Sequence, residues 1–418
     1  MQRRTPFAAL AMALLACRSS TPAGEPADLL LPDVTVIDGL GGQPLANRTI
    51  EIRDGAIVAI RPARPDDRDS LGVAGGFVIP GMFDTHVHLG QDAATLRQIL
   101  DSLLRSGLTS VREMACCADL YRPLESQADS TAMPRIFYSA FWADPVFFRV
   151  DPRVSSTPGA GTAPWLLGVT DSTDLPAAIR AAKAAGATGI KIYSNLVPAT
   201  VAAIVGEAHT AGMRVWSHPV IFPTRPSEVV RAGVDVVSHA ALLVWEGADS
   251  VPRRYNQGHP FNAFGPPAPY ASVPPDSPAV LGVLEAMRDR GTILDATIST
   301  MRRAVSEEAY RWAVAVTAEA HRMGVSIVAG TDREHFVDGA PAVHAELAAL
   351  VEDAGLSPLE AITAATASAA RAVGAGDRLG SVEVGKLADL VVLDADPSIA
   401  IGNARRVTRV LKGGRVVR

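Results

Sequence analysis

Short apolar runs alternate with helix-period segments through the middle of the chain, between about residues 77 and 373. Eight of the runs are typical of buried strands: Phe77–Phe83, Leu108–Met114, Arg135–Ala140, Gly189–Tyr193, Arg214–Ser217, Val234–Ser238, Thr292–Ala296 and Val325–Ala329. Between them, apolar residues recur every three or four positions, for example over Leu96–Leu104, Ala177–Ala185, Val201–Ala211, Val280–Arg288, Glu308–Arg322 and Ala342–Ala354. Eight strands that alternate with helices predict an α/β fold of the (β/α)8 barrel type.

Both ends of the chain show a different pattern, in which short apolar or alternating runs are separated by turn residues. Strands are predicted over Leu29–Asp38, Arg48–Ile52 and Ala56–Ile60, and again over Leu390–Leu393 and Val407–Leu411. Neither end has enough strands to bury a core by itself. We therefore predict one discontinuous domain made of residues 29–80 and 376–418, with the barrel at residues 81–375. Two separate flaps are the alternative.

Two long stretches without a regular pattern interrupt the barrel, at residues 141–170 and 241–278. Each follows a predicted strand, the third and the sixth, so both should lie at the mouth formed by the carboxyl ends of the strands. The second stretch is rich in proline between Pro252 and Pro278. Because loops of this length in a compact domain are usually functional, we expect both to shape substrate choice.

Composition narrows the class of protein. Of 418 residues, 48% are hydrophobic and 20% are charged, which is ordinary for a globular protein and excludes general disorder. The formal net charge is −5 and no basic tract occurs, so no nucleic-acid partner is expected. The sequence contains no run of about 18 apolar residues, so no membrane-spanning helix is predicted in the mature chain. The three cysteines, Cys17, Cys116 and Cys117, are too few for a disulfide scaffold.

The first residues have the pattern of an export signal. A basic start is followed by an apolar stretch, Pro6–Ala16, and then by Cys17. The run Leu14–Cys17 resembles the bacterial lipobox, which implies that a signal peptide of residues 1–16 is removed and that Cys17 is lipidated. Residues 17–28 would then tether the protein to the cell envelope, and the absence of aspartate after the cysteine favours the outer membrane. An ordinary secretory signal with an incidental cysteine is the alternative.

Ligand-type side chains recur where the predicted barrel strands end. His86 and His88 close the first strand, and their spacing lets both imidazoles point the same way from an extended chain. Such a pair is a weak signal alone, but later strands end in Lys191, His218, His239 and Asp332. Because the carboxyl ends of barrel strands converge on one face, these six side chains should share one pocket. Imidazoles and carboxylates are ligands of divalent metals, so the pattern predicts a metal centre.

The motifs resemble the amidohydrolase superfamily over nearly the whole mature chain. The likeness rests on the strand-end residues and on the phrases Val78–His88 and Leu379–Leu390, and it is greatest to imidazolonepropionase-like and prolidase-like metal-dependent hydrolases. It implies a barrel with a small β-sandwich built from both chain ends. It also implies the following ligands: His86, His88 and Asp332 for a buried ion, His218 and His239 for a second ion, and Lys191 as a bridge between the two, carboxylated by CO₂.

The resemblance implies a chemistry as well. Two divalent ions, with zinc favoured by the four histidines, would lower the pKa of a bridging water to give hydroxide. Asp332 would take the proton of that water and then protonate the leaving nitrogen. The expected reaction is hydrolysis of an amide or peptide-like C–N bond in a small-molecule substrate, as in a dipeptidase or an N-acyl amino acid hydrolase.

Other functions stay open on the sequence alone. The same dinuclear site would serve a lactone or phosphotriester hydrolase. A catalytically dead barrel used as a binding lipoprotein is a third class, against which the six filled ligand positions argue. A barrel lysine paired with a carboxylate is the alternative role for Lys191. A homo-oligomer is compatible with the sequence.

Several neighbouring positions bear on specificity. Deaminases of the superfamily usually carry a catalytic glutamate three residues after the fifth-strand histidine, and Ile221 at that position disfavours deamination. Arg112 and Glu113 end the second strand, where relatives commonly carry aspartate, and no role is assigned to them. Tyr193 either hydrogen-bonds a substrate carbonyl or packs at the barrel rim. Arginines that either bind a substrate carboxylate or are simply solvated are Arg149, Arg153, Arg225, Arg253, Arg254 and Arg333.

Overall fold

The computed structural model describes residues 27–89, 93–115, 133–255, 266–332 and 335–417. Parallel strands form its central sheet in the order β14-β13-β12-β11-β10-β7-β6-β5. Their bounds are β5 (Met82–Val87), β6 (Leu108–Glu113), β7 (Arg135–Ala143), β10 (Gly189–Ile192), β11 (Arg214–Ser217), β12 (Val236–Ser238), β13 (Ile293–Asp295) and β14 (Ile327–Val328). Backbone hydrogen bonds from Thr85 to Ala329 (2.9 Å) and from Asp332 to His86 (2.7 Å) join the first strand to the segment of the last, so the sheet nearly closes into a barrel.

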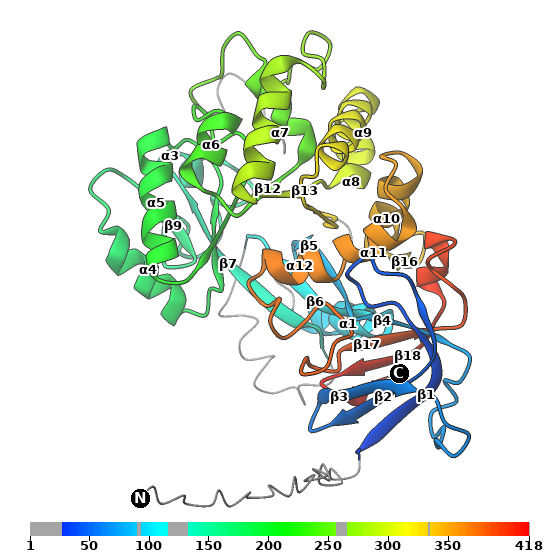
Figure 1. Ribbon diagram of the computed structural model, residues 1–418. Helices are drawn as coiled ribbons and strands as arrows, with labels where there is room; N and C mark the ends of the chain where they lie inside the picture. The colour runs from blue at the N-terminus through cyan, green and yellow to red at the C-terminus, as the bar shows by residue number, and fades with distance from the viewer. Residues whose placement is uncertain (1–26, 90–92, 116–132, 256–265, 333–334, 418) are drawn as a thin grey trace, which may run out of the picture.

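Helices alternate with these strands and surround the barrel (Figure 1). The longer ones are α1 (Ala93–Arg105), α4 (Leu175–Ala184), α5 (Pro198–Thr210), α7 (Pro278–Arg290), α9 (Glu307–Arg322) and α10 (Val343–Glu352), and all six were predicted from periodicity. The shorter ones are α3 (Pro145–Val150), α6 (Pro226–Ala232), α8 (Ile298–Ala304), α11 (Pro358–Ala364), α12 (Ala367–Ala372) and the 3₁₀ helices η1 (Ala240–Glu246) and η2 (Ile401–Arg405). In α1, for example, Leu96, Leu100 and Leu103 are buried, which gives the helix one apolar stripe to pack on the barrel.

Both ends of the chain build a second, mixed sheet, in which blue and red strands lie side by side in Figure 1. Its order is β19 (Arg415–Val416), β18 (Val407–Lys412), β17 (Leu390–Leu393), β4 (Phe77–Pro80), β1 (Leu29–Val36), β2 (Leu45–Arg53) and β3 (Ala56–Pro62). Its separate core contains Leu31, Ile50 and Val78 from one end of the chain and Leu390 from the other. The predicted fold, a (β/α)8 barrel with a small domain drawn from both chain ends, is confirmed.

The junction between the two sheets differs from the prediction. A single strand was predicted over Phe77–Phe83, but β4 pairs with β17 and β1 in the small sheet, whereas β5 starts the barrel. Gly81 separates them, and a Cβ at this position would lie 2.1 Å from Oγ1 of Thr109. The close approach of the backbone to β6 therefore requires glycine. Nothing in the apolar run marks the change from the small sheet to the barrel. Because β5 begins at Met82 and ends at Val87, His86 lies within it.

The two predicted mouth loops contain regular structure. The stretch 141–170 holds the end of β7, helix α3 and the short strands β8 (Thr162–Ala163) and β9 (Leu166–Gly168), of which β9 pairs with β7. The stretch 241–278 begins with η1. A hairpin of β15 (Phe336–Val337) and β16 (Ala340–Pro341) follows β14, the last strand of the barrel.

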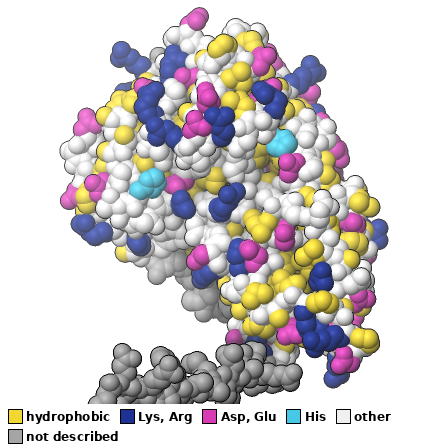
Figure 2. Space-filling view, viewed as in Figure 1, with side chains coloured by type: hydrophobic (Ala, Val, Ile, Leu, Met, Phe, Trp, Pro, Cys, Tyr) yellow, Lys and Arg dark blue, Asp and Glu magenta, His cyan; other side chains and the backbone are white. Residues whose placement is uncertain are grey.

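Several predictions fall outside the described residues, namely the signal peptide, the tether up to residue 26, the lipidation of Cys17, and the adjacent Cys116 and Cys117. Within the described ranges, the structure holds no helix with the length and apolar character needed to span a membrane. Basic and acidic side chains are interspersed over the face shown in Figure 2, in keeping with the small net charge of −5.

Candidate metal centre

The six residues expected to bind metal come from five strand ends of the barrel. His86 lies in β5 and Lys191 in β10, while His218 and His239 directly follow β11 and β12. Asp332 lies shortly after β14, and its backbone N–H bonds to the carbonyl of His86. These five residues are buried, whereas the side chain of His88 is 39% exposed. The exposed position places His88 on the solvent side of the group.

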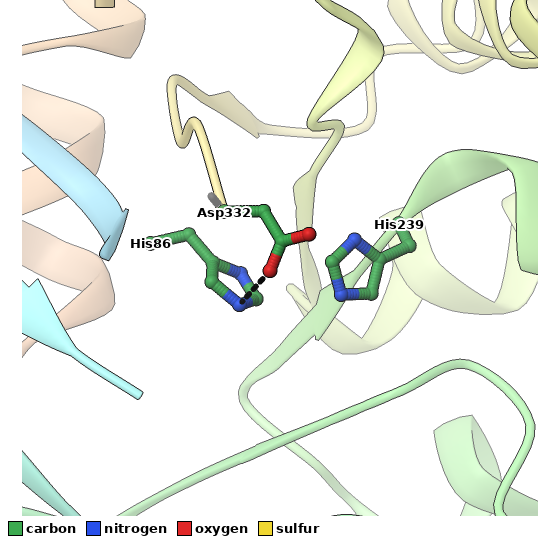
Figure 3. A group of neighbouring side chains, drawn as sticks. All are labelled: His86, His239 and Asp332. Atoms are coloured by element: carbon green, nitrogen blue, oxygen red, sulfur yellow. Dashed lines mark ion pairs between the residues drawn. The ribbon is translucent and has the colours of Figure 1, made fainter. Parts of the chain in front are cut away.

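Three of these residues form a compact group. The ligand atoms of His86, His239 and Asp332 all lie within 4.8 Å of one another, and the carboxylate of Asp332 sits between the two rings (Figure 3). Oδ1 of Asp332 is 3.4 Å from Nε2 of His86 and 3.2 Å from Nε2 of His88. The compact group thus contains His86 and Asp332, which the resemblance implies for the buried ion, together with His239, which it implies for the second ion, while His88 contacts Asp332 from the solvent side.

His218 and Lys191 lie next to this group without belonging to it. The ring of His218 is 4.8 Å from the ring of His239, centroid to centroid. Nδ1 of His218 and Nζ of Lys191 are both buried, and neither has a hydrogen-bond partner among the described residues. Since a buried amine without a partner is unfavourable, the environment of Lys191 calls for a group that the protein alone does not supply.

Burial disfavours the charged forms of four nitrogen donors, His86, Lys191, His218 and His239. It lowers the pKa of His86 to about 4, despite the nearby carboxylate of Asp295, and lowers the pKa values of His218 and His239 well below their ordinary value. Burial, reinforced by the charge of Arg112, lowers the pKa of Lys191 to about 7. Neutral imidazoles and a partly neutral amine are the forms that bind a cation or react with CO₂.

Asp332 is the anion of the group. Burial by itself would raise the pKa of this carboxyl, but the hydrogen bond from His88 and the nearby histidines hold the pKa below its ordinary value. The carboxylate is therefore ionised at neutral pH and available to a cation or to a proton donor.

The backbone at the mouth is held in a sparsely populated conformation. His239, Thr297 and Asp332 have φ values of 75°, 48° and 68°, in the left-handed region that non-glycine residues rarely adopt. Strained residues of this kind persist where the surrounding structure fixes them, and they cluster at functional sites. Two of the three are candidate ligands, and the third contacts a ligand.

Two residues that the sequence reasoning missed orient the histidines. Asp295, at the end of β13, accepts a hydrogen bond from Nδ1 of His86 at 2.9 Å. Oγ1 of Thr297 lies 2.8 Å from Nδ1 of His239. Such partners fix the rotamer and tautomer of a ligand histidine. The available signal for Asp295 was its place at the end of the seventh predicted strand, where a polar side chain faces the same mouth.

An aromatic wall lies beside His218. The ring of Tyr193 is 4.3 Å from that of His218, and its hydroxyl is 3.1 Å from the hydroxyl of Tyr255. Arg153 lies over the Tyr193 ring at 5.5 Å, and its charge is balanced by two hydrogen bonds to buried Asp151. Tyr193 is therefore held next to the candidate centre.

The other candidate mouth arginines fall into three groups. Arg225 donates to the backbone carbonyls of Trp245, Glu246 and Ala248, which makes it a support of the loop after η1. Arg149, Arg253 and Arg254 are exposed, and Arg333 lies outside the described residues. Arg153 is thus the arginine that the described structure brings against the aromatic wall.

The residues fit a centre for divalent metal ions. Imidazole nitrogens with a carboxylate are a donor set that suits zinc and related ions. Carboxylation of Lys191 would convert the unpartnered buried amine into an anion able to bridge two cations.

Parts of the chain are similar to known amidohydrolases. The sequence model of the amidohydrolase family matches residues 274–417. Adenine deaminase of Desulforamulus reducens is 24% identical over 156 residues, 36% of this chain and 25% of the relative. Imidazolonepropionase of Geobacillus sp. (strain WCH70) is 41% identical over 66 residues, 15% of this chain and 16% of the relative. The matched stretches thus span a quarter or less of these two curated relatives.

The fold agrees with that family. The crystal structure of a putative prolidase from Bifidobacterium longum superposes with a TM-score of 0.66 at 25% identity, covering 93% of this chain and 94% of that chain. The family model covers about a third of the chain, so the chain is similar to amidohydrolases there, and members of that family generally use divalent metals. Structures with the same fold include a putative prolidase and a molinate hydrolase.

Proposed function

We propose that this protein is a metal-dependent hydrolase of amide or peptide-like C–N bonds, with two divalent ions bridged by a carboxylated Lys191. The observation that carries the proposal is the buried Nζ of Lys191, which has no hydrogen-bond partner in the described structure and shares the barrel with the cluster of His86, His239 and Asp332. The match of residues 274–417 to the amidohydrolase family and the likeness to a putative prolidase support it.

The chain's own residues divide the task of holding the ions. His86, His88 and Asp332 would hold one ion, His218 and His239 would hold the other, and Lys191 would bridge them. When bound, the ions would acidify a water molecule and polarise the substrate carbonyl. Zinc is the proposed metal because imidazole nitrogens dominate the donor set.

Asp332 is the proposed proton carrier. Its carboxylate is ionised and buried, and Nε2 of His88 fixes its orientation from 3.2 Å away. It would accept a proton from the attacking water and return that proton to the leaving nitrogen, so that the amine departs uncharged. Tyr193, held by Tyr255 and Arg153, would donate its hydroxyl to the substrate carbonyl.

Deamination is the second candidate, because a curated relative is an adenine deaminase. The position three residues after His218 argues against it. Ile221 is fully buried there, and its apolar side chain has no proton to transfer to or from a purine ring. Amide hydrolysis therefore remains the first proposal.

A turnover panel tests the proposal. The zinc-loaded protein is assayed with dipeptides, including ones that end in proline, N-acyl amino acids, adenine, a lactone and a phosphotriester. Amide or peptide hydrolysis is expected in the wild type and in Lys183→Ala, which removes an exposed lysine of α4. Lys191→Ala should lose most of this activity. Turnover of adenine alone, or of the ester substrates alone, would contradict the proposal.

A further inference from the structure

Arg112 is a fully buried arginine that has no part in the function proposed above. It lies on β6, and its guanidinium stacks over the ring of Trp216, 4.9 Å from the centroid. Gly189 leaves room for that ring, because a Cβ at this position would lie 2.5 Å from it. Arginine is almost never fully buried unless it is paired, so its contacts indicate what it does.

These contacts join Arg112 to the strand that carries His86. Nη2 of Arg112 donates to Oδ2 of Asp295 at 2.8 Å, and Nε donates to the carbonyl of Thr85, the residue before His86. The same Oδ2 atom accepts from Nδ1 of His86 at 2.9 Å. One carboxylate oxygen therefore lies between a fixed guanidinium and the imidazole.

The arrangement sets the tautomer of His86. Oδ2 of Asp295 accepts from the guanidinium of Arg112, which has only N–H donors, and from the hydroxyl of Ser238 at 2.8 Å, so this oxygen offers lone pairs to His86. Nδ1 of His86 must then donate, which leaves Nε2 as the lone-pair atom. Nε2 is the atom that lies 3.4 Å from Oδ1 of Asp332, inside the cluster.

Fold stability is a poor explanation for this buried pair. Nη1 of Arg112 is buried and has no hydrogen-bond partner within the described part of the chain. An unpaired N–H in the interior is unfavourable, and replacing a buried ion pair with apolar residues is often neutral or stabilising. The geometry accounts for the arginine better through its effect on Asp295 than through stability.

We infer that Arg112 is a positioning residue of the metal centre, which acts by holding Asp295 against His86 so that Nε2 of His86 faces the ion. The inference rests on the proposed function, because it assumes that His86 is a metal ligand. Partners of this kind typically change metal affinity by about 10- to 100-fold when they are removed.

The test is a double-mutant cycle on zinc affinity, measured by competition between the metal-free protein and a chromophoric chelator. Arg112→Met and Asp295→Asn should each weaken zinc binding by about 10- to 100-fold. The loss in the double variant should be smaller than the sum of the two single losses, because Arg112 acts mainly through that carboxylate, although its Nε also holds the carbonyl of Thr85. Arg112→Lys keeps a cationic donor and should recover much of the affinity.

A matched control separates this role from the loss of any internal arginine. Arg135, whose side chain is 33% exposed, also pairs with a buried carboxylate, that of Asp389, through contacts of 3.0 and 3.2 Å between the barrel and the small sheet. Arg135→Met should leave zinc affinity unchanged. Should Arg112→Met fail to fold, Arg112→Gln, which removes the charge and keeps polar hydrogen-bonding atoms, replaces it in the cycle.

The outcomes distinguish the inference from the proposed function. Zinc affinity of Arg112→Met within about twofold of wild type, or losses that simply add in the double variant, would overturn the inference. If wild type hydrolyses amides and binds zinc while only the cycle fails, the inference alone is wrong. If wild type binds no zinc, both are wrong.

Discussion

Gly330 lies where the barrel is most crowded, and its replacement tests the geometry of the site. A Cβ at this position would lie 2.3 Å from Oδ1 of Asp295, 2.7 Å from Cβ of His86 and 3.0 Å from Oγ1 of Thr85. None of the three atoms is the far end of a flexible side chain, since each is buried and held by β5 or β13. Gly330→Ala should therefore push Asp295 and His86 apart.

The loss of stability in Gly330→Ala can be estimated from these close contacts. Forcing one extra carbon into a well-packed interior typically destabilises a protein by about 1–3 kcal/mol. We expect Gly330→Ala to lower the unfolding midpoint of the metal-free protein, measured by circular dichroism. Because the displaced pair orients His86, zinc affinity should also fall by about tenfold or more in the chelator competition.

Gly282 provides the control for this substitution. It lies in α7, and a Cβ there would meet nothing within 4 Å. Gly282→Ala should leave zinc affinity unchanged and stabilise the helix by about 0.5–1 kcal/mol. If Gly330→Ala matched wild type in both midpoint and zinc affinity, the packing of Asp295 against His86 described above would be wrong.

Three further predictions concern other parts of the chain. Thr297→Val removes the hydroxyl 2.8 Å from Nδ1 of His239 and should weaken zinc binding by about tenfold, whereas Thr297→Ser should not; equal affinities would refute the contact. Burial raises the pKa of Glu346 to about 7, so this residue should make stability fall as pH rises from about 4.5 to 7. The free energy of unfolding of Glu346→Gln, measured with urea, should therefore rise relative to that of wild type as the pH increases across that window. A difference between the two proteins that stays constant with pH would refute the prediction. If Cys17 is lipidated, as its sequence suggests, Cys17→Ser should move the protein out of the membrane fraction, and unchanged partitioning of a processed variant would exclude the anchor.

The fold was accessible from the sequence because both of its domains are periodic. Eight apolar runs separated by helix-period segments specify a barrel almost by themselves. The domain boundary was predicted at residue 81, but the division of the run Phe77–Phe83 into strands of two sheets was not, because only the close approach of Gly81 to Thr109 marks the turn. Short helices such as α6 and α8 were also missed, since seven residues carry too little periodicity to recognise.

The candidate site was partly accessible for a related reason. Ligand residues can be recognised by their residue type and by their position at a strand end, and the barrel brings the strand ends together. The supporting residues are harder to recognise: Asp295 also stands at a strand end, but its role, like that of Arg112, depends on pairings across the barrel. Asp295 is 209 residues from His86 along the chain, and Arg112 is 183 residues from Asp295. No local pattern around Arg112 indicates the carboxylate that it meets.

The central claim is that Lys191 bridges two metal ions, and metal content measures it most directly. Wild type, Lys191→Ala and the exposed-lysine control Lys183→Ala are saturated with zinc, freed of excess ion, and analysed for zinc per chain. Wild type and Lys183→Ala should hold two ions per chain, and Lys191→Ala should lose at least one of them. Two ions per chain in Lys191→Ala, or one in wild type, would contradict the account.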